Sequence, residues 1–510
     1  MIGTSWIVSL ARIFSRAQVG VQAPEVIVEV HLGNGLPAFH IVGLPEASVK
    51  ESKDRVRSAL ENSQFGFPDQ RITVNLAPAD LPKEGGRFDL AIAVGILVAS
   101  GQINCPDIHR YEFYGELALN GEVRGVNAIL PSVLGAKEQG RCCFLPAEND
   151  NLASLVSGVS RKAVYSLQDV WNDLLNQQPL PLNICYPEQQ SQRDSLLDLS
   201  DVKGQPGAKR VLEIAAAGGH NLLFLGPPGT GKSMLAQRMS TIMPTMSDDE
   251  AISTAALYSI IGQSVDLSNW RERPFRNPHH TCSAVALVGG SSNPKPGEIS
   301  LAHNGVLFLD ELPEFERKVL DSLREPMETG VVTISRAARQ MEFPSQFQLI
   351  AALNPSPTGS HTDKRATPDQ VLRYLSRVSG PFIDRIDLQI ELPRLTSSQL
   401  QSTQVEESSE QVRARVERAY AIQLNRQGKV NARLNNKEMS IHCELAAAEL
   451  QFLAKASEKL ALSPRSYHRV IKVARTISDL KAQPAITLSE LKEALNYRAF
   501  ERLISQLTQY

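Results

Sequence analysis

The 510-residue sequence has few cysteines, no long apolar run and almost no net charge. Its six cysteines form no C-x-x-C pair and are too sparse for a disulfide framework, so we expect reduced, mainly structural thiols. No apolar run approaches the roughly 18 residues needed to span a bilayer. The N-terminus has no basic region before its short apolar stretch, which disfavours a secretory signal. We therefore expect a cytoplasmic protein with no membrane partner.

The charges are balanced, with 53 basic and 55 acidic residues and a formal net charge of −2. This balance excludes a uniformly basic coat of the kind that histones carry. It still permits local basic loops, because net charge does not describe how charge is distributed. Hydrophobic residues make up 42% and charged residues 21%, as is usual for soluble globular proteins. A chain of this length predicts roughly three domains.

The first part of the chain, residues 1–172, has a mixed α/β pattern. Strands are predicted at 25–32 and 71–76, and helices at 46–63 and 88–101, from periodicity 2 and from helical spacing. Asn120-Gly121 predicts a two-residue hairpin turn, which requires positive φ at both residues.

Composition divides the remainder of the chain. Residues 173–198 are rich in Gln, Pro and Ser and predict a linker. Residues 199–395 have a dense α/β pattern, and residues 396–510 a mostly helical one. The fold class is therefore α/β, with a mixed N-terminal domain, a parallel-sheet core and a helical C-terminal domain.

The strongest motif is G-x-x-x-x-G-K-S, which follows the apolar strand NLLFL and precedes a helix. Glycines let successive backbone N–H groups converge on phosphates, the lysine reaches the β- and γ-phosphates, and the serine hydroxyl ligates Mg²⁺. The helix also directs its positive dipole end at the anion. The candidate nucleotide-binding residues are Gly226, Pro227, Pro228, Gly229, Thr230, Gly231, Lys232 and Ser233. The cofactors predicted from this motif are ATP and Mg²⁺.

Two further buried strands end in polar residues. The apolar run 306–309 is followed by Asp310 and Glu311, which we expect to hold Mg²⁺ through water and to polarise the attacking water. The strand QLIAAL is followed by Asn354, which is placed to orient that water, with a turn residue before Pro355 as the alternative. Arg385 is a candidate to stabilise a neighbouring subunit's γ-phosphate. On spacing alone, a surface ion pair with Asp384 or Asp387 is the favoured alternative.

Taken together, GPPGTGKS, VLFLDE, AALNP and SGPFIDRID resemble an AAA+ ATPase of the magnesium-chelatase-like group. The segments DVKGQPGAKRVLEIAAAGGHNLLF and GLPAFHIVGLPEASVKESKDRVRSAL narrow the resemblance to the ComM/YifB family. The match covers nearly the whole chain. It implies a ring-shaped hexameric DNA helicase that drives branch migration when incoming DNA is recombined in natural transformation, with single-stranded and branched DNA and other recombination or competence proteins as partners.

The resemblance also assigns roles by position. It makes Gly226 to Ser233 the phosphate-binding loop, Asp310 and Glu311 the Mg²⁺ and water-activating pair, and Asn354 the first sensor. It makes Arg385 an arginine finger acting across a subunit interface. Arg465, in LSPRSYHRVIKVARTI, matches the second sensor, although a solvated charge at a helix start is the reading without the family.

Two loops are the candidates for DNA contact by the same resemblance. They are an insertion at 277–300 and a hairpin at 329–343, which Gly330 could turn. Lys295, Arg336 and Arg339 are the candidate phosphate contacts, with ordinary solvated loop charges as an equal alternative. The pair His279 and His280 has no Cys or carboxylate at ligand spacing, so we interpret it as structural or pore-lining rather than metal-binding.

The sequence departs from its relatives at two places. The N-terminal region resembles the Lon protease domain, but Arg87 and Leu130 fall at the positions of its Ser nucleophile and Lys base, so we predict no proteolysis. We interpret this domain as a platform for oligomerisation or for handling DNA. The loop after Asn354 lacks the four-cysteine cluster of many relatives, so no structural zinc is expected there.

Three functional classes remain open from the sequence. A DNA motor is favoured by the full-length resemblance. A chelatase-type subunit would share the ATPase core but has no use for a Lon-like domain. A protein-remodelling ATPase is compatible with the loss of the Ser-Lys pair.

Overall fold

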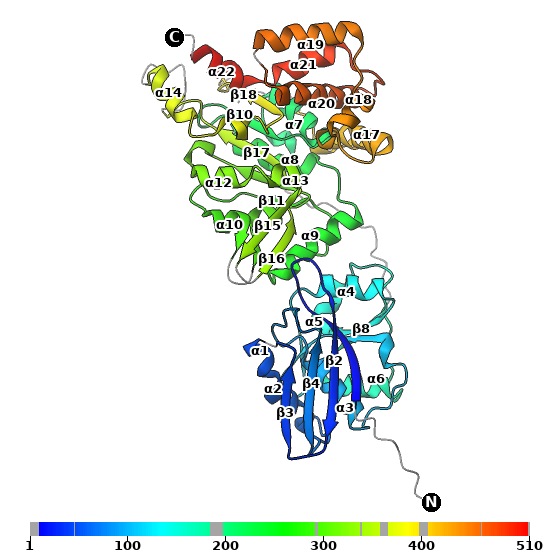
Figure 1. Cartoon of the computed structure of the whole chain (residues 1–510). Coiled ribbons are helices and arrows are strands. Elements are labelled where there is room, and N and C mark those ends of the chain that lie inside the picture. The colour runs from blue at the N-terminus through cyan, green and yellow to red at the C-terminus, as the bar shows by residue number, and fades with distance from the viewer. Residues whose placement is uncertain are drawn as a thin grey trace, which may run out of the picture. The chain divides into compact units, whose positions relative to one another are not determined.

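The computed structural model describes residues 10–44, 46–183, 197–290, 294–336, 339–357, 366–396, 406–460 and 462–507. It divides into two compact units (Figure 1). The first falls within Met1–Gln192, Asp249–Trp270 and Arg339–Glu342, and the second within Arg193–Asp248, Arg271–Ala338 and Phe343–Tyr510. Among the helices described, none combines the length and the apolar character needed to cross a bilayer.

The first unit is built on a seven-stranded mixed sheet with the order β3-β4-β2-β1-β5-β8-β9. Neighbours β1–β2 and β2–β4 are antiparallel, and the other neighbours are parallel. The strands are β1 (Leu10–Arg16), β2 (Glu25–Gly33), β3 (Ala38–Val42), β4 (Arg71–Ala77), β5 (Tyr111–Phe113), β8 (Cys142–Pro146) and β9 (Arg161–Val164). The predicted alternation in β2 is confirmed, because Val26, Val28 and Val30 are fully buried.

The helices of this unit are α1 (Ala47–Lys50), α2 (Ser52–Asn62), α3 (Asp89–Ala99), α4 (Ile129–Glu138), α5 (Ala147–Ala153) and α6 (Leu167–Leu174). The prediction of a largely buried helix at 88–101 is confirmed by α3. The helix predicted at 46–63 is present as two segments, α1 and α2, which are interrupted at Glu51. Beyond this break, Ser52 is fully buried and accepts a hydrogen bond from Arg55 (3.1 Å).

The predicted hairpin joins β6 (Glu116–Leu117) to β7 (Val123–Arg124). The prediction of a two-residue turn is wrong, because Gly121 has a φ of 87° but Asn120 does not have a positive φ. The Gly121 amide donates to Ala118 O and the Ala118 amide to Glu122 O, both at 2.9 Å. This pattern belongs to a three-residue loop in which the glycine alone takes the left-handed conformation.

Helix α9 (Asp248–Ile260) belongs by sequence to the second α/β region but packs within the first unit. Its Ala255 and Ala256 are buried in one apolar cluster with Leu130 of α4. The Ala128 amide at the start of α4 donates to Ser259 O at 2.9 Å. Contacts between segments distant in sequence therefore place this helix on the N-terminal fold.

The second unit contains a five-stranded parallel sheet with the order β11-β14-β17-β10-β18. Its strands are β10 (Leu222–Leu225), β11 (Phe275–Arg276), β14 (Val306–Leu309), β17 (Gln348–Leu353) and β18 (Leu388–Glu391). Two-stranded sheets are formed by β12 (Gly289–Gly290) with β13 (Lys295–Pro296) and by β15 (Val331–Arg336) with β16 (Arg339–Pro344). Because β10, β14 and β17 are buried along their whole length, they appear in the sequence as continuous apolar runs.

Helices of the sheet region are α7 (Pro206–Gly218), α8 (Lys232–Ile242), α10 (Ala284–Val288), α11 (Glu298–Leu301), α12 (Arg317–Ser322), α13 (Pro326–Thr329), α14 (Pro368–Leu375) and α15 (Gly380–Ile383). The C-terminal helices are α17 (Ser409–Gln427), α18 (Asn436–His442), α19 (Ala447–Leu460), α20 (Pro464–Leu480), α21 (Leu488–Asn496) and α22 (Ala499–Leu507). A single apolar core joins both groups, since Phe224, Phe308, Val416, Leu453 and Val470 belong to one buried cluster. Figure 1 shows these C-terminal helices gathered at the β10–β18 side of the sheet.

Candidate functional site

The predicted phosphate loop joins the carboxyl end of β10 to the N-terminus of α8. Gly229 and Gly231 have φ of 80° and 87°, and a Cβ atom on either would meet nothing within 4 Å. Both glycines therefore supply a left-handed backbone beside open space, as a backbone cradle for phosphate requires. Gly226 is needed for a different reason, because the backbone of Leu392 passes close to it. A Cβ atom at this position would lie 2.9 Å from Leu392 O.

Lys232 is buried at the first position of α8 and folds back onto the loop. Its Nζ donates to Gly226 O (2.6 Å), Pro227 O (3.0 Å) and Asn354 Oδ1 (3.0 Å). Burial lowers the pKa of this ammonium, while the charges of Asp310 and Glu311 raise it. All three donors of the lysine thus have acceptors within the protein.

The acidic pair lies directly beyond β14. Ser233 Oγ donates to Asp310 Oδ2 at 2.6 Å, so a hydroxyl and a carboxylate meet at the start of α8. These are the oxygen ligands that Mg²⁺ prefers. The Glu311 amide donates to Asp310 Oδ1 (2.9 Å), and Glu311 has φ of 51°, a left-handed conformation that is uncommon for a residue with a side chain.

Glu311 has a partner that the sequence analysis missed. His280 Nδ1 lies 3.2 Å from Glu311 Oε2. The His280 ring packs against the His279 ring, with centroids 4.1 Å apart, and meets the Phe315 ring edge-on, with centroids 6.5 Å apart. The predicted structural or pore-lining role of the two histidines is not tested by these contacts. Among the described residues, no cluster of three or more His, Cys, Asp or Glu could hold a metal ion.

Asn354 follows β17, the strand between β10 and β14. Its side-chain oxygen faces the lysine of the phosphate loop, so it is more than a turn residue before Pro355. The structure therefore brings Lys232, Ser233, Asp310 and Asn354 together at the carboxyl ends of three adjacent parallel strands, where open α/β sheets bind ligands.

Arg385, between α15 and β18, has only 7% of its side chain exposed. Its Nη2 lies 2.7 Å from Glu328 Oε1, and its other nitrogens donate to Arg324 O (3.2 Å) and Pro381 O (2.6 Å). The alternative of a surface ion pair with a neighbouring aspartate is therefore wrong. The guanidinium instead contacts Glu328 of α13, the Arg324 carbonyl and its own preceding helix α15.

Arg465 is the second residue of α20, whose N-cap is Ser463. Its side chain is more than half exposed, and Nη2 lies 3.8 Å from the same Glu328 oxygen. The two arginines singled out in the sequence thus share one carboxylate.

Comparisons with known proteins agree with this architecture. Residues 198–400 match the family described as magnesium chelatase, subunit ChlI, residues 28–149 match subunit ChlI of Mg-chelatase, and residues 406–498 match its C-terminal family. The chain is 54% identical over 506 residues to competence protein ComM of Haemophilus influenzae, which covers 98% of this chain and 99% of that protein. It is 48% identical over 502 residues to YifB of Escherichia coli, with the same coverage.

The chain belongs to the ComM/YifB family. A more distant similarity, 27% identity over 136 residues, links it to Lon protease 2 of Bacillus subtilis and covers 26% of this chain and 24% of that protein. The predicted fold class is confirmed: a Lon-like α/β part, a magnesium-chelatase-like AAA+ sheet and a helical C-terminal region. Membership of this AAA+ group indicates an ATPase.

In this ComM/YifB chain, the positions aligned with the Lon Ser and Lys are both buried. Arg87 donates to Asn127 O at 2.6 Å, and burial lowers the pKa of its guanidinium to about 10. The next peptide N–H, that of Ala128, donates to Ser259 O of α9. Leu130 lies in the apolar cluster that also receives α9. These two positions therefore support the packing of α9.

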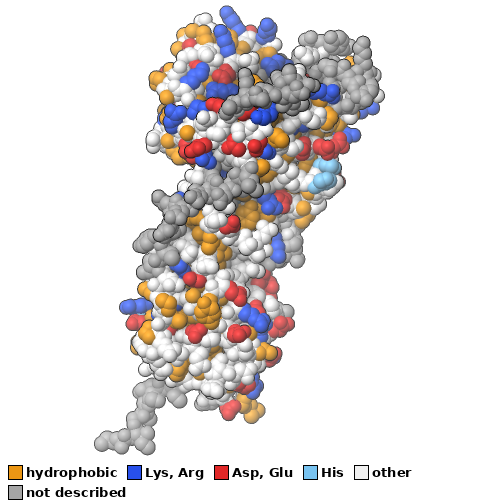
Figure 2. Space-filling model, turned by 180° about the vertical axis from the view of Figure 1, so that it is seen from behind, with side chains coloured by type: hydrophobic (Ala, Val, Ile, Leu, Met, Phe, Trp, Pro, Cys, Tyr) orange, Lys and Arg blue, Asp and Glu red, His pale blue; other side chains and the backbone are white. Residues whose placement is uncertain are grey.

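The candidate DNA contacts are only partly described. Lys295 is exposed at the start of β13. Arg336 ends β15 and Arg339 begins β16, but their side chains lie outside the described residues, as do residues 358–365 of the loop after Asn354. Figure 2 shows basic and acidic side chains interspersed on one face of the molecule, in keeping with the small net charge.

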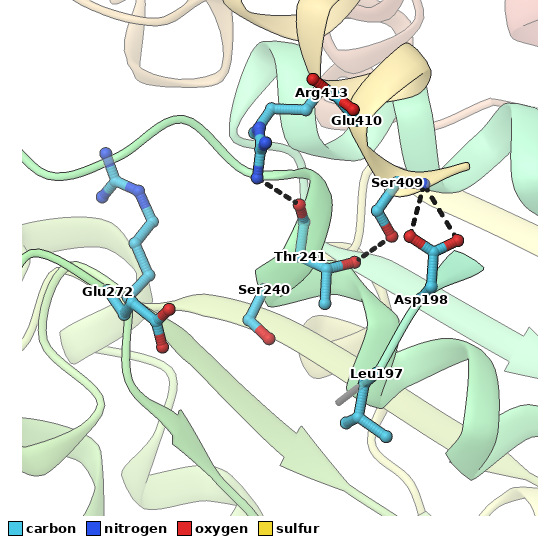
Figure 3. A pocket seen from close by; sticks show the side chains of 9 residues that line it. Leu197, Asp198, Ser240, Thr241, Glu272, Ser409, Glu410 and Arg413 are labelled. Atoms are coloured by element: carbon cyan, nitrogen blue, oxygen red, sulfur yellow. Dashed lines mark hydrogen bonds between the residues drawn. The ribbon is translucent and has the colours of Figure 1, made fainter. Parts of the chain in front are cut away.

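A polar pocket of about 170 Å³ lies where the far end of α8 meets the start of α17 (Figure 3). Thr241 Oγ1 of α8 lies 2.7 Å from Ser409 Oγ, and the Ser409 amide donates to both Asp198 carboxylate oxygens (3.2 and 3.1 Å). The helix that starts at the phosphate loop is thus connected at its other end to the C-terminal helices.

Proposed function

We propose that this chain is an ATP-driven hexameric DNA motor that promotes branch migration during recombination of incoming DNA in natural transformation. The observation that carries the ATPase part is the convergence of Lys232, Ser233, Asp310 and Asn354 at one edge of the parallel sheet. The competence assignment of the relative that is 54% identical over almost the whole chain supports the biological setting.

The residues fit ATP and Mg²⁺. The loop from Gly226 to Gly231 and the start of α8 would hold the phosphates, and Lys232 would exchange its loop carbonyls for β- and γ-phosphate oxygens. Ser233 and Asp310 would hold Mg²⁺, which neutralises charge on the phosphates when bound.

Two side chains would handle the attacking water. Glu311 would polarise it, and Asn354 would orient it from the neighbouring strand. For Glu311 to act as a base, its carboxylate must be free to face the water, so its contact with His280 would have to open.

Arg385 would serve the nucleotide of the adjacent subunit, as an arginine finger acting across the ring interface. Arg465, which shares Glu328 with it, would serve that same nucleotide. Hydrolysis would then depend on a completed interface between neighbours, as a ring would supply.

The DNA part of the proposal assigns Lys295, Arg336 and Arg339 to sequence-independent phosphate contacts. Such contacts suit a translocating motor, because every position along a strand offers the same charge, and they weaken with salt.

The test is the steady-state ATPase rate with and without single-stranded, duplex and branched DNA, at two salt concentrations, with Lys232→Ala as the blank. We expect stimulation that is largest with branched DNA and that falls at the higher salt concentration. No stimulation by any DNA would reject the motor. Appreciable hydrolysis by Lys232→Ala would reject the site.

A chelatase-type ATPase is the second candidate, because the matched family carries that description over residues 198–400. It predicts ATP hydrolysis that DNA leaves unchanged and that depends on a porphyrin and its metal. The same rate measurement with a porphyrin and Mg²⁺ in place of DNA separates the two.

A further inference from the structure

Two guanidinium groups approach one carboxylate in the second unit, and two further arginines act on the charge of one of them. Arg385 and Arg465 both approach Glu328 Oε1, at 2.7 and 3.8 Å. Burial is the main cause that lowers the pKa of Arg385, the charges of Arg465, Arg324 and Arg469 add to it, and Glu328 opposes it. Glu328 is therefore the anion that stabilises a closely packed group of positive charges.

The cluster keeps an excess of positive charge. Arg469 is paired with Asp387, and Arg324 lies 3.7 Å from Asp321. Arg385 and Arg465 share the single charge of Glu328, and Arg385 also donates to two neutral carbonyl oxygens. A phosphate group, with more charge and more acceptor oxygens than one carboxylate, would therefore compete well for these two side chains.

Glu328 also lies at the base of the β15–β16 hairpin. It belongs to α13, whose last turn is closed by the Gly330 amide donating to Pro326 O (2.9 Å). The Ser345 amide donates to Gly330 O (2.8 Å), so the two ends of the hairpin are joined at the residue where α13 stops. Glu328 thus lies three residues before the first residue of β15, so a change in its contacts occurs next to the hairpin.

We propose that Glu328 is a positioning residue that holds Arg385 and Arg465 until the phosphates of an adjacent subunit's nucleotide replace it. In a subunit without that neighbour's nucleotide, the carboxylate keeps both arginines on α13. When the arginines transfer to the phosphates, α13 and the base of the hairpin lose this constraint. The engagement of nucleotide and the movement of the hairpin are linked through this one carboxylate. This inference rests on the proposed action of Arg385 across the interface.

The contact between Glu328 and the two arginines is weak enough to be broken and remade. Glu328 has 47% of its side chain exposed, so water screens its attraction for the arginines. A pair that water screens on one side changes an equilibrium by up to about fivefold. Removing the charge should therefore raise turnover severalfold without removing any group from the catalytic site.

The experiment compares Glu328→Gln with the wild type in the full chain. We expect the DNA-free kcat to rise about two- to fivefold, the KM for ATP to stay unchanged, and the ratio of DNA-stimulated to DNA-free rate to fall. Combined with Arg385→Ala, the substitution should add nothing, because the group that Glu328 holds is then absent. Glu325→Gln is the matched control, since it removes the same charge from an exposed residue at the start of the same helix, and it should behave as wild type.

An unchanged or reduced DNA-free kcat in Glu328→Gln, with an unfolding temperature like that of wild type, would overturn the inference. An equal gain in Glu325→Gln would do so as well, because it would show a general effect of charge. If Glu328→Gln fails to fold, Glu328→Asp must show a smaller gain in the same direction, and no gain would overturn the inference. A wild-type chain that hydrolyses no ATP rejects the proposed function together with this inference, whereas normal wild-type hydrolysis with an unresponsive Glu328→Gln rejects this inference alone.

Discussion

Asp387 anchors helix α20, which carries Arg465, to the parallel sheet. Its buried carboxylate pairs with Arg469 Nη1 of α20, accepts the Asn221 amide (2.9 Å) at the start of β10, and lies 3.7 Å from His220 Nδ1. Burial favours the neutral acid, but Arg469, His220 and the Asn221 amide together outweigh it and hold the pKa of Asp387 well below its usual range. The carboxylate is therefore charged at neutral pH, and its pairing stabilises the fold.

Asp387→Asn preserves the size of the side chain and removes the charge. Breaking a buried pair by removing one partner costs about 3–5 kcal/mol, because the remaining charge is left uncompensated. Since Arg469 keeps 20% of its side chain exposed, water offsets part of that loss. We expect the free energy of unfolding of the second unit to fall by about 3 kcal/mol at pH 7.

The assay is denaturant unfolding followed by circular dichroism, with Asp384→Asn as the matched control. Asp384 lies three residues earlier and is partly exposed, so its substitution should change stability by less than about 0.5 kcal/mol. A depressed carboxyl pKa stabilises the fold above the unfolded value of about 3.9, and this stability is lost as the pH falls further. The difference in the free energy of unfolding between wild type and Asp387→Asn should therefore be smaller at pH 3 than at pH 7. A loss below about 1 kcal/mol at pH 7, or an equal loss in Asp384→Asn, would refute the reasoning.

Three further predictions concern other buried or catalytic groups. Burial, and to a lesser extent Arg433, lowers the pKa of His303 to about 4, and its Nδ1 accepts the Gln346 amide (3.0 Å). The unfolded chain therefore binds more protons than the folded chain below about pH 6.5, so the free energy of unfolding should fall by about 2 kcal/mol between pH 7 and pH 5. His303→Gln should reduce this dependence on pH, and an unchanged dependence would contradict the prediction. Leu130→Lys places an unpaired charge in an apolar cluster and should lower the free energy of unfolding of the first unit by more than about 3 kcal/mol, as denaturant unfolding would measure. It should create no protease activity in a casein-cleavage assay. A variant that is as stable as wild type, or that cleaves casein, would count against the packing role of Leu130. Glu311→Gln should bind a fluorescent ATP analogue as wild type does but release phosphate about 10²–10⁴-fold more slowly, and lost binding would indicate a structural role instead.

The nucleotide site could be predicted because its parts depend on local sequence. A strand that is buried on both faces must be a continuous apolar run, and its carboxyl end must open at the ligand edge of a parallel sheet. This rule predicts that Asp310 and Asn354 lie beside the loop that ends in Lys232 and Ser233, and both residues contact it. The prediction of a two-residue turn at Asn120-Gly121 is wrong because Asn-Gly also occurs in three-residue loops. In the three-residue loop, only the glycine takes positive φ.

Contacts made across long stretches of sequence could not be predicted. Nothing in the spacing of residues links Arg385 to Glu328 in preference to the nearer Asp384 and Asp387, since the pairing depends on how α13 and α15 pack. The packing of α9 within the first unit is equally hidden, because the apolar residues of a helix do not specify which core receives them.

The central claim is that each ATP is hydrolysed between two copies of the chain, and mixed subunits test it most directly. Lys232→Ala and Arg385→Ala are each expected to be inactive alone. Mixed in equal amounts, they should recover activity, because roughly a quarter of randomly formed interfaces then combine an intact phosphate loop with an intact arginine from its neighbour. Recovery that rises and falls with the mixing ratio is the predicted result. No recovery at any ratio would contradict the account.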